Sequence, residues 1–388
     1  MNENPLSICM LSDDFLPAAT GVGIHVQRAS QDLVQRGHRV CIITTRRRNE
    51  PQCEEWRGVT VYRTFTLKLF GFYQALPSPG TIRQIFRDNA VTLVHHHYLG
   101  VLLMRAERVA RKLGLPQAYT YHMTVDHLTQ PWPMKPFRAI ISRQILRYGN
   151  RFDLVIVPAL DLETKIRADG IRTPIRHISN PIVFDSTDQV TPAPRPAAFM
   201  VLYAGRLNPE KNLPLLLQAF GKLLHLDLDA GLWIAGIGDQ RERLETMCRS
   251  LGIAGRVQFL GFLAHSELAR YYAGCDVFVL PSLVETQGLV AMEAMRFARP
   301  IVVTRAIVSA RELVEEGVNG YIVDPHVPAA LADRLMALAR DPELRKRLGR
   351  AGAQRSLAYS PERVAAALER AYRDILAGRR RRDQRLFG

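Results

Sequence analysis

The chain has 388 residues, of which 47% are hydrophobic and 23% charged, and its formal net charge is +15. This composition excludes a disordered or collagen-like chain, and the length is that of roughly two globular domains. The five cysteines are scattered without a CxxC pair. They predict neither a disulfide framework nor a zinc site, and they are typical of a reducing cytoplasm.

The N-terminus lacks a basic stretch followed by an apolar one, and no apolar run approaches the ~18 residues of a membrane span. We therefore expect a cytoplasmic protein that is soluble or at most peripheral on the inner face of the plasma membrane. The excess of arginine favours an anionic partner such as nucleic acid, lipid headgroups or a phosphate-bearing substrate.

Strand-like apolar runs alternate with helix-length amphipathic segments along the first half of the chain. Helices are predicted at residues 24–36 and 99–113, each followed by a glycine, the usual helix stop. Buried strands are predicted at residues 7–11, 39–45, 91–97, 117–122 and 153–158. This alternation is typical of a parallel sheet with helices on both faces.

A second series of the same kind begins at residue 199. The Pro-rich residues 184–198 between the two series predict a linker. The sequence thus predicts an α/β protein with two doubly wound domains, residues 1–183 and 199–358. Because ligands of open parallel sheets bind beyond the carboxyl ends of the strands, residues after each strand are site candidates.

Two cations follow the first strand of the second series, in LYAGRLNPEKN. Gly205 ends the strand, and Arg206, Lys211 and Asn212 precede a predicted helix. Cations beside a helix N-terminus form the kind of site that phosphates use. A solvated loop in which Glu210 pairs with a cation is the alternative interpretation.

The next strand ends in IAGIGDQRERLE, where Gly236 and Gly238 flank a tight turn before Asp239. Glycine at these positions lets another group approach the backbone closely. Without a third glycine the segment is no dinucleotide fingerprint, and an ordinary strand-to-helix turn explains it as well.

Two glutamates lie eight positions apart in ETQGLVAMEAM. Glu285 follows a buried strand, and Glu293 lies about two helical turns further on. This spacing can bring both carboxylates to one side of a cleft, where one meets sugar hydroxyls and the other a ribose. Backbone N–H groups at the helix start can meet a diphosphate; they belong to Gln287, Gly288, Leu289 and Val290.

Four motifs of the second domain resemble, in order and spacing, those of the retaining family 4 glycosyltransferases of GT-B fold. They are GRLNPEKN, IAGIGD, the strand-end PS and the E-x7-E of ETQGLVAMEAM. The resemblance covers nearly the whole chain and implies two Rossmann-like domains facing across a cleft. It implies that Glu285 contacts the donor sugar and Glu293 the ribose. Arg206 and Lys211 then hold the donor diphosphate, and residues 236–241 lie near the base.

The opening of the chain, DDFLPAATGVGIHVQRASQDLVQRGHRV, also resembles that family. There a glycine-rich loop, here Gly21, Val22 and Gly23, precedes the first helix and lies under the sugar diphosphate. Backbone amides of such a loop would hold the phosphate.

Histidines follow two further strands of the first domain. LVHHHYLG resembles the family's H-x-H pattern near the acceptor, which implies acceptor-side positions for His97 and Tyr98. Tyr98 stands where many relatives carry Pro. In TYHMTVDH, His122 corresponds to the histidine that contacts the donor sugar, beside Tyr121 on the acceptor side. A surface or core histidine is the alternative for His122.

The resemblance implies retaining transfer of a hexose from a nucleotide-diphosphate sugar, UDP-sugar rather than GDP-sugar, to a hydroxyl acceptor. It implies no metal and no cofactor besides this donor substrate. His122, Glu285, Arg206 and Lys211 are the implied catalytic residues. The chain departs from its relatives at Arg305 and Ile307, which leaves the sugar and base open.

Three features predict contact with an anionic membrane surface. Residues 133–152 carry Arg138, Arg143, Arg147 and Arg151 along one predicted helical side, with apolar residues between them. Residues 65–77, a predicted loop with Lys68 and Phe70, are rich in aromatics. The resemblance also implies a helix, 359–378, that crosses back to the first domain, and a basic tail, 379–388, follows it. Each feature has an alternative interpretation. Residues 133–152 can be a core-facing helix, residues 65–77 a wall on the acceptor side, and the tail a frayed terminus.

The ETQG sequence resembles that of glycolipid synthases that glucosylate diacylglycerol, which implies a membrane lipid acceptor. A cell-envelope or exopolysaccharide transferase acting on a lipid-linked sugar is the alternative within the class. Outside it stand a nucleotide-sugar epimerase and a nucleic-acid-binding module. No RNA or DNA motif is recognisable, so no nucleic-acid partner is expected.

Overall fold

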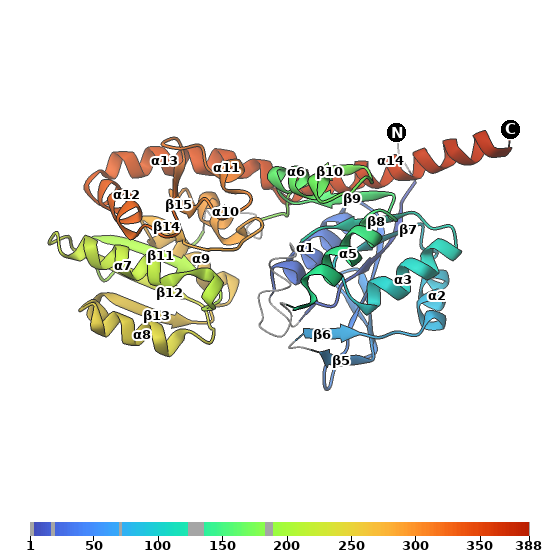
Figure 1. Cartoon of the computed structure of the whole chain (residues 1–388), viewed down its shortest axis with the longest axis horizontal. Helices are drawn as coiled ribbons and strands as arrows, with labels where there is room; N and C mark the ends of the chain where they lie inside the picture. Colours follow the sequence, from blue (N-terminus) through green and yellow to red (C-terminus); the bar gives the residue numbers. More distant parts are fainter. Residues whose placement is uncertain (1–3, 17–19, 70–71, 123–135, 183–188, 388) are drawn as a thin grey trace. The chain divides into compact units, whose positions relative to one another are not determined.

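The computed structural model describes residues 4–16, 20–69, 72–122, 136–182 and 189–387. The chain forms two compact units, which we call unit 1 and unit 2. Unit 1 contains residues Met1–Val183 and Pro361–Gly388, and unit 2 contains Phe184–Ser360. Each unit contains a sheet of mainly parallel strands covered by helices (Figure 1).

Unit 1 has an eight-stranded sheet with the order β10-β9-β8-β7-β1-β2-β4-β3, in which only β3 runs antiparallel to its neighbour. The strands are β1 Ser7–Leu11, β2 Arg39–Thr45, β3 Cys53–Trp56, β4 Val59–Thr64, β7 Leu93–His96, β8 Gln117–Thr120, β9 Leu154–Val157 and β10 Ile175–His177. The strand order reverses between β1 and β7. This reversal is the position at which open α/β sheets bind their ligands.

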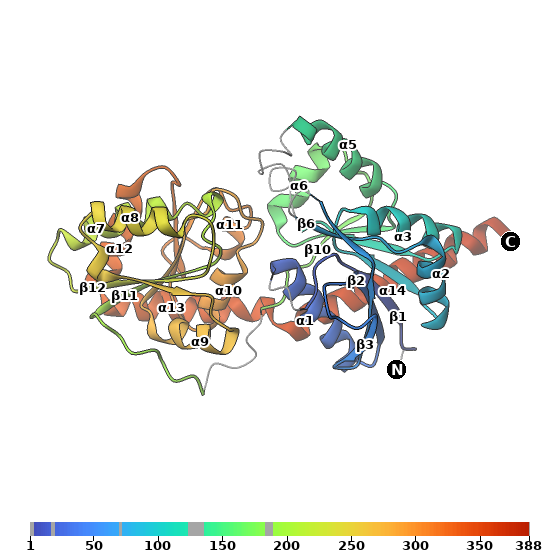
Figure 2. The ribbon, with the colours of Figure 1, turned by 90° about the horizontal axis from the view of Figure 1, so that it is seen from below.

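Helices cover both faces of the unit 1 sheet. Apolar residues of α1 and α14 pack on one face, and those of α2 and α3 pack on the other (Figure 2). The helices are α1 Gly21–Gln35, α2 Pro79–Asp88, α3 Val101–Lys112, α5 Arg138–Gly149, α6 Leu160–Ala168 and α14 Pro361–Phe387. Burying two apolar faces is what a parallel sheet needs in order to be stable.

Two local predictions in unit 1 are wrong. Helix α1 begins at Gly21 instead of residue 24, because the Thr20 side chain caps it by accepting the Gly23 N–H at 3.0 Å. The first turn of the helix therefore contains Gly21, Val22 and Gly23, and these residues are not part of a loop that precedes the helix. The predicted loop at residues 65–77 contains the antiparallel hairpin of β5 Thr66–Leu69 and β6 Phe72–Ala75.

The last helix is longer than predicted and belongs to unit 1. Helix α14 continues to Phe387, so the predicted end at residue 378 is wrong. Its Tyr372 hydroxyl lies 2.7 Å from His95 Nδ1 in strand β7. Arg379, the first residue of the predicted basic tail, makes two hydrogen bonds to Asp153 at 2.9 and 2.8 Å. Its charge is therefore already paired within unit 1.

Unit 2 has an all-parallel sheet of six strands with the order β13-β12-β11-β14-β15-β16. The strands are β11 Phe199–Ala204, β12 Ala230–Ala235, β13 Val257–Gly261, β14 Val277–Leu280, β15 Ile301–Thr304 and β16 Gly320–Val323. The helices are α7 Leu213–Leu224, α8 Arg241–Ser250, α9 His265–Gly274, α10 Leu289–Arg296, α11 Ala310–Leu313, α12 Pro328–Arg340 and α13 Pro342–Ser356. The strand order reverses between β11 and β14, so the loops after these two strands mark the expected ligand position.

Among the described helices, none combines the length and the apolar character needed to cross a membrane.

Candidate active site

The loops after β11 and β14 meet through a lysine and a glutamate. The Lys211 ammonium donates a hydrogen bond to the Glu285 carboxylate, and both side chains are largely buried, with exposed fractions of 12% and 22%. The Leu283 N–H also donates to the Glu210 carbonyl at 2.8 Å. The sheet topology thus brings together two predicted site residues that are 74 positions apart in the sequence.

Helix α10 begins directly after this pair. Gly288 is its N-cap with a φ of 74°, in the left-handed region that favours glycine. The helix bonds start with the N–H groups of Ala291 and Met292, which both donate to the Gly288 carbonyl, at 2.9 and 3.3 Å. The N–H groups of Leu289 and Val290 precede these bonds, so the helix presents its positive end beside Lys211 and Glu285.

A second segment holds the loop that carries Glu285. The Val308 N–H donates to the Glu285 carbonyl at 3.0 Å, and the Ser309 hydroxyl donates to the Gln287 carbonyl at 2.6 Å. These contacts fix the loop backbone just before the start of α10. A preorganised backbone is what stabilisation of developing charge requires.

Arg206 has a different environment from Lys211. Its side chain is 68% exposed and donates to Glu210 at 3.1 Å. This ion pair with Glu210 agrees with the alternative interpretation of the segment as a solvated loop. Asn212 takes the left-handed conformation at φ 53° and its amide donates to the Pro325 carbonyl at 2.9 Å. Asn212 therefore joins the loop after β11 to the segment that follows β16.

Gly236 and Gly238 allow a close approach, and the approaching group is the neighbouring loop of unit 2. A Cβ atom on Gly236 would lie 1.8 Å from the Gly205 carbonyl oxygen. One on Gly238 would lie 2.5 Å from the carbonyl group of Leu207. Packing of the loops after β11 and β12 thus explains both glycines, while the side chain of Asp239 is exposed.

Glu293 is buried inside unit 2, and it is bonded to Tyr272, whereas Glu285 is bonded to Lys211. It is 3% exposed, and the Tyr272 hydroxyl donates to its carboxylate at 2.9 Å. His265 Nε2 lies 3.8 Å from the same carboxyl group. Burial raises the pKa of Glu293 to about 7, although the bond from Tyr272 acts in the opposite direction.

This raised pKa predicts a pH-dependent stability. Between its ordinary pKa and about 7, the folded protein binds a proton that the unfolded chain releases, so this contribution to stability is lost as the pH rises. Glu293→Gln keeps an acceptor for Tyr272 and removes the titration. Relative to this variant, the wild type should lose up to about 3 kcal/mol between pH 4.5 and pH 8. Denaturant unfolding at both pH values measures the difference, with the exposed Glu267→Gln as control. A difference that stays constant with pH would contradict the expectation.

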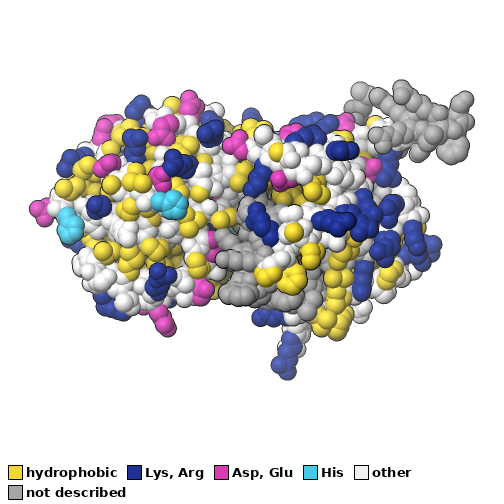
Figure 3. All heavy atoms as spheres, in the orientation of Figure 1, with side chains coloured by type: hydrophobic (Ala, Val, Ile, Leu, Met, Phe, Trp, Pro, Cys, Tyr) yellow, Lys and Arg dark blue, Asp and Glu magenta, His cyan; other side chains and the backbone are white. Residues whose placement is uncertain are grey.

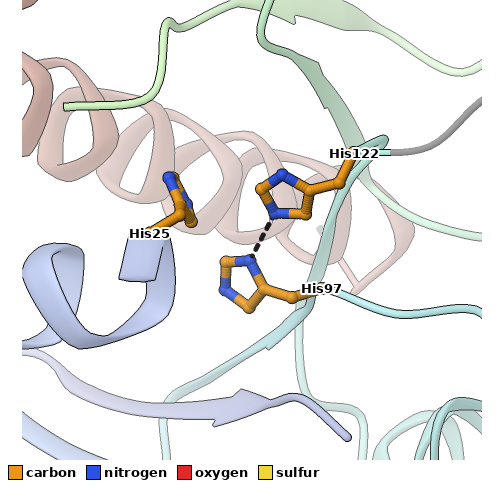
Figure 4. A group of neighbouring side chains, drawn as sticks. All are labelled: His25, His97 and His122. Carbon is orange, nitrogen blue, oxygen red and sulfur yellow. Dashed lines mark hydrogen bonds between the residues drawn. The ribbon is translucent and has the colours of Figure 1, made fainter. Parts of the chain in front are cut away.

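In unit 1 the histidines after the strands gather around the reversal of strand order. His97 follows β7, His122 follows β8, and His25 lies in α1 (Figure 4). His97 Nδ1 lies 3.1 Å from His122 Nε2, and the rings of His25 and His122 pack edge to face at 4.7 Å. All three are buried, and burial lowers the pKa of each, which keeps the imidazoles neutral.

These three histidines could hold a metal ion. Each offers one ring nitrogen, and the three atoms lie within 4.8 Å of one another. Neither ring nitrogen of His25 has a hydrogen-bond partner among the described residues, nor has His97 Nε2. Neutral imidazole nitrogens bind zinc, but they also bond sugar hydroxyls. The expectation of a metal-free enzyme stays a prediction.

The other predicted acceptor and membrane residues are spread over unit 1. Tyr98 is half-buried, and burial raises its pKa, whereas Tyr121 is buried against Tyr119. Lys68 lies on β5 with its ammonium 5.5 Å from the centre of the Tyr73 ring. Phe70 is outside the described residues.

The predicted arginine side of residues 133–152 is only partly correct. Arg138, Arg143 and Arg147 are all exposed on α5. Arg143 lies five positions after Arg138, which is about 140° around a helix, whereas Arg143 and Arg147 are one turn apart. Of the four predicted arginines only these two share a side of α5, because Arg151 lies beyond the end of the helix at Gly149. Residues 133–135 lie outside the described part of the chain.

Sequence reasoning missed two residues near the reversal in unit 1. Asp13 lies two residues after the end of β1, is buried, and accepts the Ala75 N–H at 2.8 Å. Burial raises its pKa to about 7. His25 lies one turn into α1. The position of Asp13 after a strand was a usable signal, whereas His25 becomes significant only beside His97 and His122.

Arg305 and Ile307, the residues at which the chain departs from the family, line a cavity of about 380 Å³ in unit 2. Arg305 forms an ion pair with Asp324, and Ile307 forms a β-bridge with Glu285. The cavity therefore adjoins the loop that carries Glu285.

Comparison with known proteins identifies the class. Residues 19–185 match the family model "Glycosyltransferase Family 4", and residues 188–355 match "Glycosyl transferases group 1". A D-inositol 3-phosphate glycosyltransferase from Frankia alni is 33% identical, over 74% of each chain. The chain belongs to the family 4 glycosyltransferases and is an enzyme of sugar transfer, as its motifs predicted.

A further relative and two solved structures are also similar to this chain. A sulfoquinovosyl transferase from Arabidopsis thaliana is 29% identical over 84% of this chain and 65% of its own length, so the chain spans about two thirds of that enzyme. Sucrose-phosphate synthase from Thermosynechococcus elongatus has a TM-score of 0.79 at 22% identity, over 96% of this chain and 100% of that one. An Anabaena protein in complex with UDP-glucose has a TM-score of 0.75 at 20% identity, over 95% and 100%. The predicted GT-B fold class is confirmed.

Proposed function

We propose that the protein is a retaining, metal-independent hexosyltransferase that uses a nucleotide-diphosphate sugar and glycosylates a hydroxyl group of a membrane lipid such as diacylglycerol. The observation that carries the proposal is the Lys211–Glu285 pair beside the first turn of α10, where the strand order of unit 2 reverses. An ammonium group and a helix N-terminus together favour a diphosphate.

The proposed chemistry consists of positioning and charge stabilisation. As the sugar leaves the diphosphate, Lys211 and the N–H groups of Leu289 and Val290 stabilise the negative charge that develops. Glu285 accepts hydrogen bonds from the sugar, and the neutral His122 imidazole bonds a sugar hydroxyl. The Arg206 guanidinium, which donates to Glu210 at an exposed position, can turn toward the phosphates at little cost.

The choice of UDP-sugar over GDP-sugar is supported by the Anabaena protein, whose structure contains UDP-glucose. A lipid acceptor at the inner face of the membrane is supported by the ETQG sequence and by the basic surface of unit 1. Figure 3 shows Lys and Arg side chains gathered on one face of unit 1 with few Asp or Glu among them. A soluble phosphorylated acceptor is a second candidate, which the inositol-phosphate relative favours.

Donor binding is tested by thermal unfolding with UDP-glucose, GDP-glucose or ADP-glucose in the presence of EDTA. A ligand that binds only the folded protein raises the melting temperature, by an amount that grows with its affinity. UDP-glucose should give the largest rise, and Lys211→Ala should reduce that rise. A larger rise with GDP-glucose would contradict the base preference, and loss of every rise in EDTA would contradict metal independence.

A further inference from the structure

A cavity of about 520 Å³ opens in unit 1 beyond the carboxyl ends of β2 and β4. These strands pair in parallel, with Thr45 opposite Thr64. Three consecutive arginines that follow β2 line the cavity: Arg46, Arg47 and Arg48. Ligands of open parallel sheets bind at this edge, and a run of guanidinium groups here is suited to an anion. We call this site the arginine cavity.

The charges of the three arginines are only partly neutralised. Arg63, the fourth arginine of the cavity, is buried and paired with Glu54 at 2.6 Å and Glu50 at 3.4 Å. Arg46 Nε donates to the Glu50 carbonyl at 3.0 Å, and the Arg47 N–H donates to the Glu50 carboxylate at 2.7 Å. Arg48 has no hydrogen bond or ion pair with the described residues. The turn is thus fixed while guanidinium donors remain for a ligand.

The N-terminus of α2 forms another part of the wall. Ser78 caps this helix by accepting the Thr81 N–H at 3.0 Å, and both residues line the cavity. Their hydroxyl groups lie 2.9 Å apart and bond each other, so one O–H remains as a donor, and the positive end of the helix adds to the arginine charge. This combination of donors matches the oxygens of a phosphate group.

Apolar side chains border the arginine cavity. Phe65 lines it and is 67% exposed, and on the adjoining β5–β6 hairpin Leu67 is 43% and Tyr73 38% exposed. The Arg47 guanidinium lies 4.8 Å from the centre of the Tyr73 ring. Cations beside exposed aromatic and aliphatic groups are typical of surfaces that meet the boundary between headgroups and acyl chains. A freely soluble phosphate would leave these apolar groups in water.

We infer that the arginine cavity binds the phosphate of an anionic lipid headgroup, while Phe65, Leu67 and Tyr73 contact the adjoining acyl region. The arginine cavity would thus be the lipid-binding site of unit 1 in the proposed function. Only the role of the bound lipid, as acceptor or as membrane anchor, rests on that proposed function. Binding itself requires no sugar transfer.

The test is co-sedimentation of the full-length protein with phosphatidylcholine vesicles, with and without phosphatidylglycerol. The variant R46Q/R47Q/R48Q should bind the anionic vesicles at least about tenfold more weakly than the wild type. R243Q/R347Q/R350Q removes three exposed arginines of unit 2 and is the charge-matched control. It should lose less than about twofold, because its arginines lie outside the cavity. Equal melting temperatures establish that both variants fold.

A second variant separates a lipid from a free phosphate. F65S/L67S retains all arginines and should also bind anionic vesicles more weakly, and millimolar glycerol phosphate should not displace the wild type. Equal losses in the two arginine variants would overturn the inference, because any basic surface would then suffice. Displacement by glycerol phosphate together with unchanged binding of F65S/L67S would likewise overturn it in favour of a soluble phosphate.

Failure of this inference can be told apart from failure of the proposed function. Vesicle binding is measured without donor, and donor binding is measured without vesicles. An R46Q/R47Q/R48Q variant that still responds to UDP-glucose in thermal unfolding, but no longer binds anionic vesicles, supports both statements. Unchanged vesicle binding with an intact donor response overturns the lipid site alone.

Discussion

Replacing Lys211 by alanine is expected to lower hexose transfer by about 10²–10³-fold, the loss typical when one preorganised charge-stabilising group is removed. The ammonium of Lys211 is largely buried and bonded to Glu285, at the start of α10. Without it, the leaving diphosphate keeps its charge next to a carboxylate. The measurement is release of UDP from UDP-glucose in the presence of vesicles that contain diacylglycerol.

The matched control is Lys222→Ala, an exposed lysine in α7 of the same unit, which should retain full activity. Glu285→Ala removes the other half of the pair and should give a comparable loss. Because the two residues contact each other, the double variant should lose less than the product of the single losses. Turnover near the wild-type rate in Lys211→Ala, with an unchanged melting temperature, would refute the proposed donor site.

Gly236→Ala is expected to prevent stable folding of unit 2. The new Cβ would lie 1.8 Å from the Gly205 carbonyl oxygen, and the backbone φ of 143° disfavours any side chain. A clash with backbone is not relieved by a side-chain rotation, so we expect a loss above about 4 kcal/mol. Soluble yield and thermal unfolding measure it. Gly255→Ala, where nothing lies within 4 Å of the new Cβ, is the control and should be neutral.

If Gly236→Ala unfolds within a few degrees of the wild type, the close packing of the loops after β11 and β12 is not what requires glycine. A loss of UDP-glucose response without a loss of stability would instead assign Gly236 to the nucleotide. The two roles therefore give different results in the same pair of measurements.

Much of the fold follows from local patterns in the sequence. Apolar runs such as residues 39–45 and 199–204 are strands because their residues are buried on both faces of a parallel sheet. Strands β5 and β6 are not predicted because the aromatic residues of this stretch favoured a loop, although Thr66–Leu69 alternates polar and apolar residues. The start of α1 was placed too late because the capping role of Thr20 was not considered, although Thr is a common N-cap.

The candidate site was found only in part. Position after a strand, together with the E-x7-E spacing, identified Lys211 and Glu285, and the structure shows that they contact each other. Nothing local indicated that Glu293 would be buried against Tyr272 or that the histidines would form one cluster. Asp13 and the arginines after β2 also follow strands, so their position along the sequence is a usable signal.

The sequence by itself determined the two α/β units, the family and the residue types that can hold a diphosphate, because these depend on periodicity and on short motifs. Only the tertiary structure decided which groups pair: Lys211 with Glu285, His97 with His122, and Tyr372 with His95. It also decided which arginines line a cavity without forming an ion pair with the described residues. The physical reason is that a parallel sheet brings together the ends of strands that are far apart in the chain, and burial and charge pairing arise only from those contacts.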